Sequence, residues 1–176
     1  MTSSSTPHLP PSTSLRAIEP EDLDLLYRIE NDVRLWNVGT SNVPYSRYVL
    51  HDYVAHVTND IYADRQVRMM IDNGEGQTVG IVDLVNFDPA NRRAEVGIII
   101  ISDYRRRGYA TATLRQICDY ALRILHLHLL YAYIDERNEA SLSLFRKAGF
   151  VTSARVPEWL FDGKDYHDAQ LLQLVL

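Results

Sequence analysis

The 176-residue sequence has a single cysteine, Cys118, so no disulfide can form within the chain. Small secreted domains are usually rich in disulfides, and we therefore expect a protein of the reducing cytoplasm. The first residues lack the basic and apolar regions of a secretory signal. No apolar run approaches the roughly 18 residues that a membrane helix needs. We expect no membrane partner.

An excess of positive charge is also missing, because 18 Lys and Arg stand against 23 Asp and Glu, a formal net charge of −5. Broad nucleic-acid binding relies on a basic face, so we expect no nucleic-acid partner. Metal-ligand spacing is lacking too. His51 and His56 would point to different sides of a helix, and His126 and His128 have no cysteine or acid nearby. The sequence indicates no metal site.

What is present suggests one domain with a tail. Residues 1–14 are dominated by Ser, Thr and Pro, and such a segment buries too little apolar surface to offset its ordering entropy. We interpret 1–14 as a disordered tail and 15–176 as a single domain. Hydrophobic residues make up 46% of the chain, which is enough for a sizeable core.

Residue patterns predict the elements of this domain. A turn is predicted at 72–76, where Asn-Gly tolerates positive φ. An apolar stripe from Leu114 to Leu125, which includes Cys118 and Leu122, indicates a helix that begins near Gly108. The other predicted helices begin at Pro20 or cover 46–58 and 138–148. The predicted strands are 15–18, 67–71, 78–87, 93–101, 130–134 and two strands joined around Asp162-Gly163. This order predicts an α/β domain with a mixed sheet and helices on both faces.

Three arginines, 105–107, precede Gly108 at the start of the predicted long helix. Free N–H groups and the helix dipole make such a terminus an anion site, and arginines add charge-assisted hydrogen bonds to phosphate. Glycine at 108 permits close backbone approach, and Ala110 keeps the first turn slim. The alternative is that three exposed arginines only solubilise a loop. The segment matches neither the Walker nor the dinucleotide-binding glycine pattern.

The pattern Arg105-x-x-Gly108-x-Ala110 resembles the acetyl-CoA pyrophosphate loop of the GNAT N-acetyltransferases, Gln/Arg-x-x-Gly-x-Gly/Ala. RRAEVGIII, residues 92–100, is similar to the central strand of that family, and NEASLSLFRKAGF, residues 138–150, to its later CoA-binding motif. The ending FDGKDYHDAQLL resembles the branch of spermidine acetyltransferases and ribosomal-protein N-terminal acetyltransferases. The resemblance covers 15–176 and implies a mixed, mostly antiparallel sheet with helices on both faces.

The resemblance implies acetyl-CoA as the cofactor. The central strand pairs its backbone with the pantetheine arm in this family, and the arginine loop holds the pyrophosphate. The implied cofactor-binding residues are Ile98, Ile99, Ile100, Arg105, Arg106, Arg107, Gly108, Tyr109, Ala110, Thr111, Asn138, Ser141, Phe145 and Lys147. Taken alone, the isoleucines equally fit a strand buried on both faces, Asn138 a helix N-cap, and Lys147 a solvated helix lysine.

Glu95 is the predicted catalytic residue. A primary amine, with a pKa near ~10.4 in a lysine-like setting, arrives protonated, so a base must take its proton before it attacks a thioester. Glu95 lies in the middle of the central strand and matches an acidic position of the spermidine-type relatives. The alternative is a surface glutamate paired with Arg92 or Arg93.

The sequence departs from many GNAT relatives at Phe145, where they carry a tyrosine that protonates the departing CoA thiolate. Phenylalanine has no hydroxyl to donate. Water or CoA itself then manages the proton, or Tyr109, Tyr131 or Tyr133 substitutes, or the protein is a poor enzyme. We name no general acid.

The acceptor is expected near the first two helices and the final hairpin, where acids and aromatics can hold a cation. The predicted substrate-binding residues are Glu30, Asp32, Trp36 and Tyr166; solvated acids and partly buried aromatics are the alternative. The stretch 37–48 carries no acid, although spermidine-type relatives tend to be acidic there. This weakens a polyamine as substrate or regulator.

The function that the sequence predicts is direct transfer of acetyl from acetyl-CoA to a primary amine, either a polyamine such as spermidine or a protein or peptide N-terminus. The partner is then a small amine or a peptide end, and a homo-oligomer is compatible with the sequence. The competing hypothesis is a non-catalytic acyl-CoA-binding module, and the reason for it is Phe145 in place of the usual tyrosine. Nucleic-acid binding through the arginines is a third hypothesis, and it predicts steep salt dependence.

Overall fold

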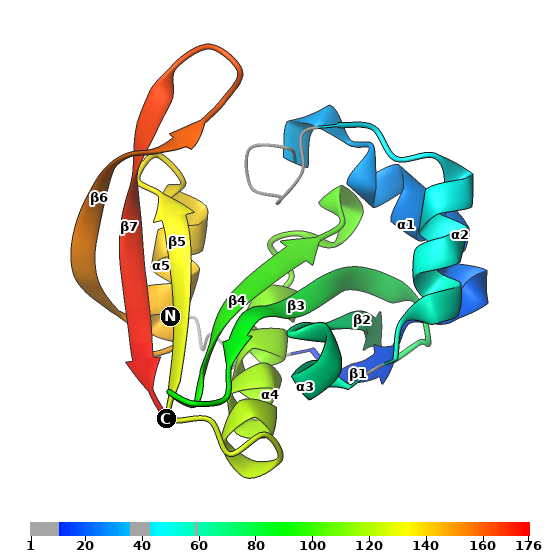
Figure 1. Cartoon of the computed structure of the whole chain (residues 1–176), viewed down its shortest axis with the longest axis horizontal. Helices are drawn as coiled ribbons and strands as arrows, with labels where there is room; N and C mark the ends of the chain where they lie inside the picture. The colour runs from blue at the N-terminus through cyan, green and yellow to red at the C-terminus, as the bar shows by residue number, and fades with distance from the viewer. Residues whose placement is uncertain (1–10, 36–42, 59) are drawn as a thin grey trace, which may run out of the picture.

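The computed structural model of the chain describes residues 11–35, 43–58 and 60–176, and Figure 1 shows the arrangement of its elements. The strands are β1 Thr13–Ala17, β2 Val67–Asn73, β3 Thr78–Asp88, β4 Arg93–Ile100, β5 Leu129–Asp135, β6 Val151–Phe161 and β7 Tyr166–Val175. The α-helices are α1 Leu23–Glu30, α2 Arg47–His56, α3 Ile61–Asp64, α4 Tyr109–Arg123 and α5 Glu139–Lys147. Short 3-10 helices are η1 Pro20–Asp22, η2 Val33–Leu35 and η3 Ser102–Tyr104.

The strands form one sheet in the order β1-β2-β3-β4-β5-β7-β6. Every neighbouring pair is antiparallel except β4 and β5, which are parallel. This confirms the predicted mixed, mostly antiparallel sheet of a single α/β domain. Because β4 and β5 run in the same direction, their carboxyl ends lie at the same edge of the sheet, and α4 and α5 both begin there (Figure 1).

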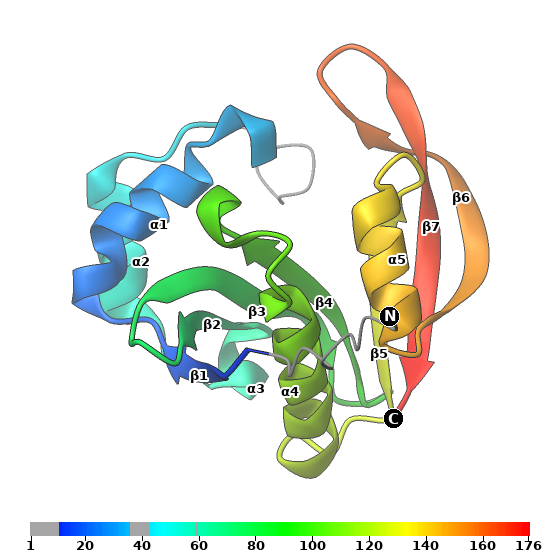
Figure 2. The same ribbon diagram turned by 180° about the vertical axis from the view of Figure 1, so that it is seen from behind.

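Alternating side chains of the sheet build two hydrophobic cores, one on each face. On one face, Met70 of β2 packs with Leu26 of α1 and Leu50 of α2. On the other face, Val96 of β4 lies in one core with Leu114 of α4. Figure 2 shows α4 and α5 in front of the sheet, on the side turned away from the viewer in Figure 1. Helices therefore cover both faces, as predicted, and we call these faces the α1 face and the α4 face.

The long helix α4 is held to the sheet by the predicted apolar stripe. Leu114, Ile117 and Ala121 are fully buried, and Cys118 packs against the same core. Each large side chain buried in this way contributes about 1.5–3 kcal/mol. Leu122 is 45% exposed, so its predicted place in the buried stripe is wrong. Burial raises the pKa of the Cys118 thiol to about 11, which leaves it a protonated core residue.

The β2–β3 turn forms at the predicted position but through a different residue. The Asn73 side chain accepts hydrogen bonds from the backbone N–H groups of Glu75 and Gln77, each at 2.9 Å. The left-handed conformation falls on Gly76, at φ 76°, and not on Asn73-Gly74. The Asn73 side chain therefore holds the turn, and Gly76 provides its left-handed residue.

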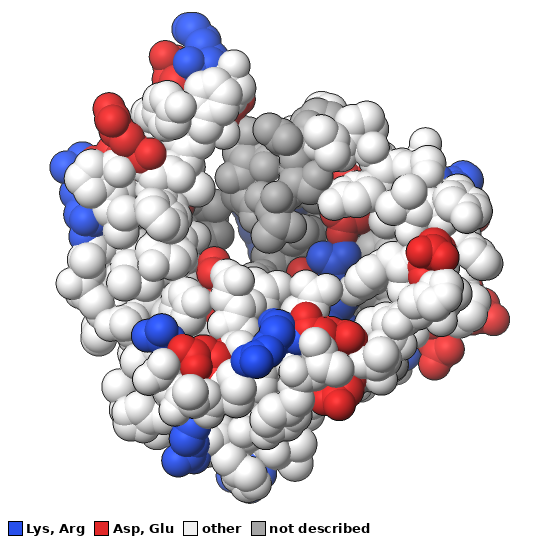
Figure 3. Space-filling model, in the orientation of Figure 1, with Lys and Arg blue, Asp and Glu red and all other residues white. Residues whose placement is uncertain are grey.

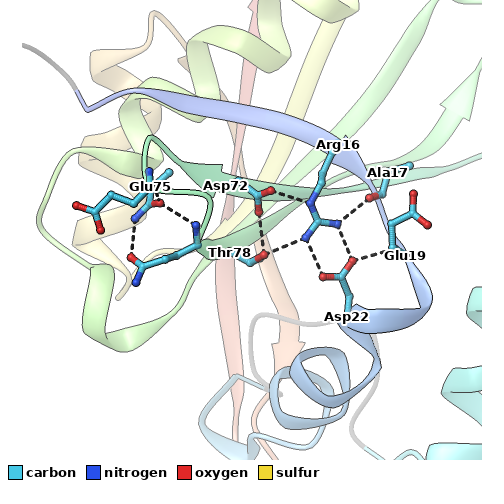
Figure 4. Close-up of polar contacts among 9 residues, drawn as sticks. Arg16, Ala17, Glu19, Asp22, Asp72, Glu75 and Thr78 are labelled. Carbon is cyan, nitrogen blue, oxygen red and sulfur yellow. Dashed lines mark hydrogen bonds and ion pairs between the residues drawn. The ribbon is translucent and has the colours of Figure 1, made fainter.

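Arg16 joins four segments of the N-terminal half, as Figure 4 shows. Its Nη1 and Nη2 atoms donate to both carboxylate oxygens of Asp22 at 2.7 and 2.8 Å, and its Nε donates to Asp72 at 2.7 Å. Nη2 also donates to the Thr78 hydroxyl at 3.0 Å. One guanidinium thus ties β1 to η1, β2 and β3.

Three features were not predicted from the sequence. β1 begins at Thr13, two residues before the predicted domain start, and residues 1–10 of the predicted tail lie outside the described residues. The helix α3 has four residues, too few for a hydrophobic period; the Asp60 side chain caps it by accepting from the Tyr62 N–H at 2.8 Å. The 3-10 helices are equally too short for such a pattern.

Candidate active site

The parallel strands β4 and β5 pair over only three residues, and the last pair is Glu95 with Tyr131. Beyond it the strands separate, while β4 stays paired with β3 to Ile100 and β5 with β7 to Asp135 (Figure 1). Each strand therefore has one edge without a strand partner there. Backbone N–H and C=O groups on such edges can hydrogen-bond an extended ligand. We call this opening the fork.

Glu95 lies at the base of the fork, on the α1 face. It alternates with Ala94 and Val96, which are buried in the core of the opposite face. The side chain is half-buried, and its Oε2 accepts a 2.8 Å hydrogen bond from Nδ2 of Asn86. Burial raises the pKa of Glu95, and the hydrogen bond from Asn86 opposes only part of that rise. A carboxylate of this kind is suited to accepting a proton.

The alternative interpretation of Glu95, a surface ion pair with a neighbouring arginine, is wrong. Arg93 pairs with Asp88 at 3.2 Å, and Arg92 donates through Nε to the carbonyl of His126 at 2.7 Å. Within the described part of the chain, the polar partner of Glu95 is instead Asn86.

Asn86 is a site residue that sequence reasoning missed. It lies where the β3–β4 register shifts between Val85 and Asp88, in a left-handed conformation at φ 51°. Asparagine tolerates this conformation better than most residues, and the irregularity lets its amide hydrogen-bond Glu95. The sequence feature that could have identified Asn86 is an asparagine within a run of strand-forming residues.

Tyr131 faces Glu95 across the last strand pair and is half-buried. Burial, and next the charge of Glu95, raise the pKa of Tyr131, so its phenol keeps its proton at neutral pH. Tyr133 follows two residues later on the same face, with its ring centroid 5.9 Å from that of Tyr131. Tyr109, the third tyrosine considered, lies at the start of α4 against Tyr104, at 6.0 Å.

The arginine loop joins the end of β4 to α4. Arg105 donates through Nε to the carbonyl of Ile100 at 2.9 Å, which fixes the loop against the strand end. Arg106 is left-handed at φ 61°, and Arg107 lies over the Tyr104 ring at 5.6 Å. All three arginines are exposed, and none has a carboxylate within ion-pair distance among the described residues.

The N-terminus of α4 is suited to a phosphate. Gly108 caps it at φ 87°, and no side chain within the described residues caps this end of the helix. A Cβ at position 108 would lie 2.9 Å from Cδ of Pro11, so glycine is required for space as well as for conformation. The first-turn N–H groups of residues 109–111, the helix dipole and the arginines together form an anion site at the edge where the fork opens.

The later predicted cofactor residues lie on α5, which also begins at that edge. Asn138 caps the helix: its side chain accepts from the Ser141 N–H at 3.1 Å, as the alternative interpretation expected. Phe145 is 3% exposed and packs edge-on against Phe150. Lys147 is exposed in the last turn, at the opposite end of α5 from Asn138.

The structure does not bring the predicted acceptor residues into one place. Glu30 pairs with Arg68 and lines a cavity of about 560 Å³ between α2 and β3. Asp32 lines a second cavity, of about 810 Å³, between α1 and the end of β4. Tyr166 is 64% exposed at the β6–β7 hairpin, and Trp36 lies outside the described residues.

A fork between parallel strands, with a half-buried carboxylate at its base and a helix N-terminus flanked by arginines beside it, suits an acyl-CoA-dependent transferase. The model of the acetyltransferase (GNAT) domain family matches residues 13–151. The spermidine N(1)-acetyltransferase of Escherichia coli K12 is 31% identical over 160 residues, which cover 90% of this chain and 83% of that protein. The chain belongs to the GNAT acetyltransferase family.

Two further comparisons agree with this assignment. The putative ribosomal N-acetyltransferase YdaF of Bacillus subtilis is 27% identical over 88% of this chain and 86% of its own. The Vibrio cholerae spermidine N-acetyltransferase, solved in complex with CoA and spermine, has the same fold, with a TM-score of 0.84 at 24% identity over 93% of this chain and 95% of that one. The predicted family and branch are confirmed. The protein is an amine N-acetyltransferase that uses acetyl-CoA, and a non-catalytic module is not favoured.

No helix among the described residues has the length and apolar character needed to span a bilayer.

Proposed function

We propose that the protein acetylates a terminal primary amine of an aliphatic polyamine, with Glu95 as the general base. One observation carries this proposal: a half-buried carboxylate with a raised pKa lies at the last residue pair of β4 and β5, where the strands separate. An aliphatic amine has a pKa near ~10.4 and arrives protonated, so it needs a base at the point of attack.

The reaction balances with one base and one proton donor. Glu95 takes a proton from the ammonium group, the amine nitrogen forms a bond to the thioester carbonyl carbon, and the carbon–sulfur bond breaks. As the amide forms, its nitrogen gives up a second proton, and the CoA thiolate takes one up, so that the products are a neutral amide, CoA thiol and one proton held by Glu95. A donor that protonates the thiolate regains its proton from that nitrogen. Phe145 cannot donate a proton to the thiolate. Tyr131, protonated and opposite Glu95, and water are the two candidate donors.

The donor half of the site follows from the anion site and the fork. We propose that Arg106, Arg107 and the first-turn N–H groups of α4 hold the pyrophosphate. The fork edge at residues 98–100 pairs with the pantetheine arm, and Arg105 fixes the loop between them. Asn138 and Ser141 lie at the start of α5 on the other side of the fork. Acetyl-CoA supplies the activated acetyl group.

A polyamine is the first acceptor because three of the relatives are named spermidine N(1)-acetyltransferases. A peptide N-terminus is the second candidate, and two observations favour it. Residues 37–48 carry no acid, and YdaF is named a putative ribosomal N-acetyltransferase. Both acceptors present a primary amine to the same base.

Three further properties belong to this proposal. A homo-oligomer is supported by a dodecameric structure of the Vibrio cholerae enzyme, with a TM-score of 0.76 at 26% identity. The free thiol of Cys118 favours the reducing cytoplasm. We keep 15–176 as the catalytic domain, with the strand residues Thr13 and Ser14 added to it, and 1–10 as part of a tail.

The test is a calorimetric titration with acetyl-CoA followed by a CoA-release screen over spermidine, spermine, putrescine and short peptides. We expect saturable acetyl-CoA binding and release of CoA with a polyamine. Release only with peptides would replace the polyamine by the second candidate. Binding of acetyl-CoA without release on any amine would contradict the enzymatic proposal.

A further inference from the structure

Three aromatic rings lead away from Glu95 along the α1 face. Tyr131 is paired with Glu95, and Tyr133 follows at 5.9 Å between ring centroids. Trp159 of β6 then stacks on Tyr133 at 5.0 Å, with 28° between the ring planes. The neighbouring residues Leu130 and Ala132 are buried in the opposite core, which confirms that both tyrosines lie on the α1 face.

Trp159 reaches this position because β6 is irregular there. The β6–β7 register shifts between Val156 and Leu160, and Glu158 is left-handed at φ 51° with its N–H donated to Asp168 at 2.9 Å. The indole contacts a ring two strands away in the sheet order, yet it remains 53% exposed. The stacked, half-exposed indole presents aromatic surface to solvent at the far end of the row of rings that begins at Glu95.

The other side of the fork carries no side chain at Gly97. This residue follows Glu95 on the α1 face and is exposed, and a Cβ there would meet none of the described atoms within 4 Å. Gly97 pairs with Asp83, whose carboxylate binds Arg68 at 2.8 and 2.9 Å. In Figure 3 the described residues form two walls on this face, one from β5, β6 and β7 and the other from α1 and α2. We call the surface around Glu95 and Gly97 the trough.

The charge of the trough suits a cation. Among the described residues, the polar partner of Glu95 is the Asn86 amide, and none of their basic side chains pairs with the Glu95 carboxylate. On the other wall, the Asp83 carboxylate binds Arg68. An aromatic face near a carboxylate that has no basic partner among the described residues can bind alkylammonium groups through cation–π contact.

We infer that the stacked pair Tyr133–Trp159 binds a second ammonium group of the acceptor while the reacting amine lies at Glu95. The pair therefore selects acceptors that carry two cations joined by a short alkyl chain over acceptors that carry one. This inference rests on the proposed function for the position of the reacting amine. Trp159 and Tyr133 act in specificity and take no part in the acetyl transfer.

The test compares putrescine with butylamine, which has the same carbon chain without the second amine. Both are titrated calorimetrically into the CoA-saturated protein, where no transfer occurs, so the result does not depend on turnover. Wild type should bind putrescine more tightly. The leucine variant Trp159→Leu should lose about 2- to 30-fold in putrescine affinity and nothing for butylamine. Trp159→Phe should lose less.

Phe161→Leu is the matched control, because Phe161 is an exposed aromatic on the same strand that contacts Tyr166 and not Tyr133. It should bind both amines as wild type does. Equal affinity of wild type for the two amines would overturn the inference, and so would an unchanged preference in Trp159→Leu. A preference for putrescine that depends on Trp159, without any CoA release from acetyl-CoA, would support the inference and contradict the proposed function.

Discussion

Glu95 of β4 and Tyr131 of β5 form the last residue pair between the two parallel strands, and both side chains lie on the α1 face. β4 and β5 are paired up to these two residues, and beyond them the two strands separate to form the fork. Burial raises the pKa of both groups, and the charge of Glu95 adds to the rise for Tyr131. A carboxylate suited to accepting a proton and a phenol that keeps its proton thus lie at the same end of the fork.

Replacing the proposed base tests its role directly. Glu95→Gln keeps the size of the side chain and removes its capacity to accept a proton, so kcat should fall by about 10²- to 10⁴-fold. The affinity for acetyl-CoA, measured by calorimetry, should stay at the wild-type value. Glu75→Gln, an exposed glutamate in the β2–β3 turn, is the control and should be fully active. A wild-type rate in Glu95→Gln would remove this residue as the base.

The hydrogen bond from Asn86 predicts a shift in pH dependence. Asn86 donates to the charged form of Glu95 and so lowers its pKa, against the larger effect of burial. Because Glu95 acts deprotonated, activity should rise with pH through its pKa. Asn86→Gly removes the donor, tolerates the left-handed backbone, and should move this rise to higher pH while the high-pH plateau is kept.

The control for that profile is Asn91→Gly, since Asn91 also lies near the β3–β4 turn but donates to Asp88 at 2.7 Å. Its pH profile should match wild type. If Asn86→Gly lowers the plateau without moving the rise, Asn86 affects the site through structure rather than through the charge of Glu95.

Much of the fold could be predicted because local patterns dictate it. The stripe on α4 and the strand–turn–strand segments are periodic, and the arginine loop lies between a strand and a helix in the sequence itself. Asn138 has the residue type of an N-cap, and it caps α5. These features depend on neighbours in sequence, which a single chain displays.

The partners across the sheet could not be predicted in the same way. The alternative interpretation paired Glu95 with Arg92 or Arg93, but the register and the bulge in β3 give it Asn86. Trp159 of β6 stacks on Tyr133 of β5 although β7 lies between these strands in the sheet order, and it does so where the β6–β7 register shifts. Such contacts depend on the order and register of the strands, and local residue patterns do not determine either of them.

Removing arginines of the loop should weaken the binding of acetyl-CoA without affecting a donor that lacks the pyrophosphate. The double variant Arg106→Gln and Arg107→Gln removes two of the charges beside the N-terminus of α4, and acetyl-CoA affinity should fall by about 10- to 100-fold. Activity with acetyl-pantetheine, which lacks the pyrophosphate, should be unchanged. Arg115→Gln, an exposed arginine further along the same helix, should bind acetyl-CoA normally. Equal losses with both donors would contradict a phosphate role.

The Arg16–Asp22 pair predicts a loss of acid stability. Burial raises the pKa of Asp22, but hydrogen bonds from Arg16 and the Glu19 N–H outweigh it, so the pKa lies below the ordinary value. The contribution to stability is then complete above the unfolded pKa of about 4 and disappears as pH falls through the folded pKa. At pH 7, Asp22→Asn should lower the free energy of unfolding by about 2 kcal/mol.

Urea unfolding at several pH values measures this contribution. The difference between wild type and Asp22→Asn should shrink from pH 6 towards pH 2. Asp24→Asn is the control, because Asp24 is 78% exposed in its pair with Arg47 and such surface pairs contribute little. A difference that stays constant with pH would show that the charge of Asp22 is not what stabilises the fold.

Filling the trough at Gly97 separates the acceptor site from the donor site. Gly97 does not lie in the left-handed region, and a Cβ there meets no atom of the described part of the chain within 4 Å, so a side chain can be added without backbone strain. Valine also favours strands, and Gly97→Val should therefore melt at or above the wild-type temperature.

The acetyl-CoA affinity of Gly97→Val should be unchanged, because the anion site lies beyond the end of β4. If the acceptor approaches Glu95 over Gly97, as the proposed function requires, the added side chain blocks it, and kcat/KM for the acceptor should fall at least about 10-fold. Gly163→Ala, in the distant β6–β7 turn, should leave kcat/KM unaltered even if its left-handed backbone lowers stability. Full activity of a folded Gly97→Val would mean that the amine reaches the thioester from another direction.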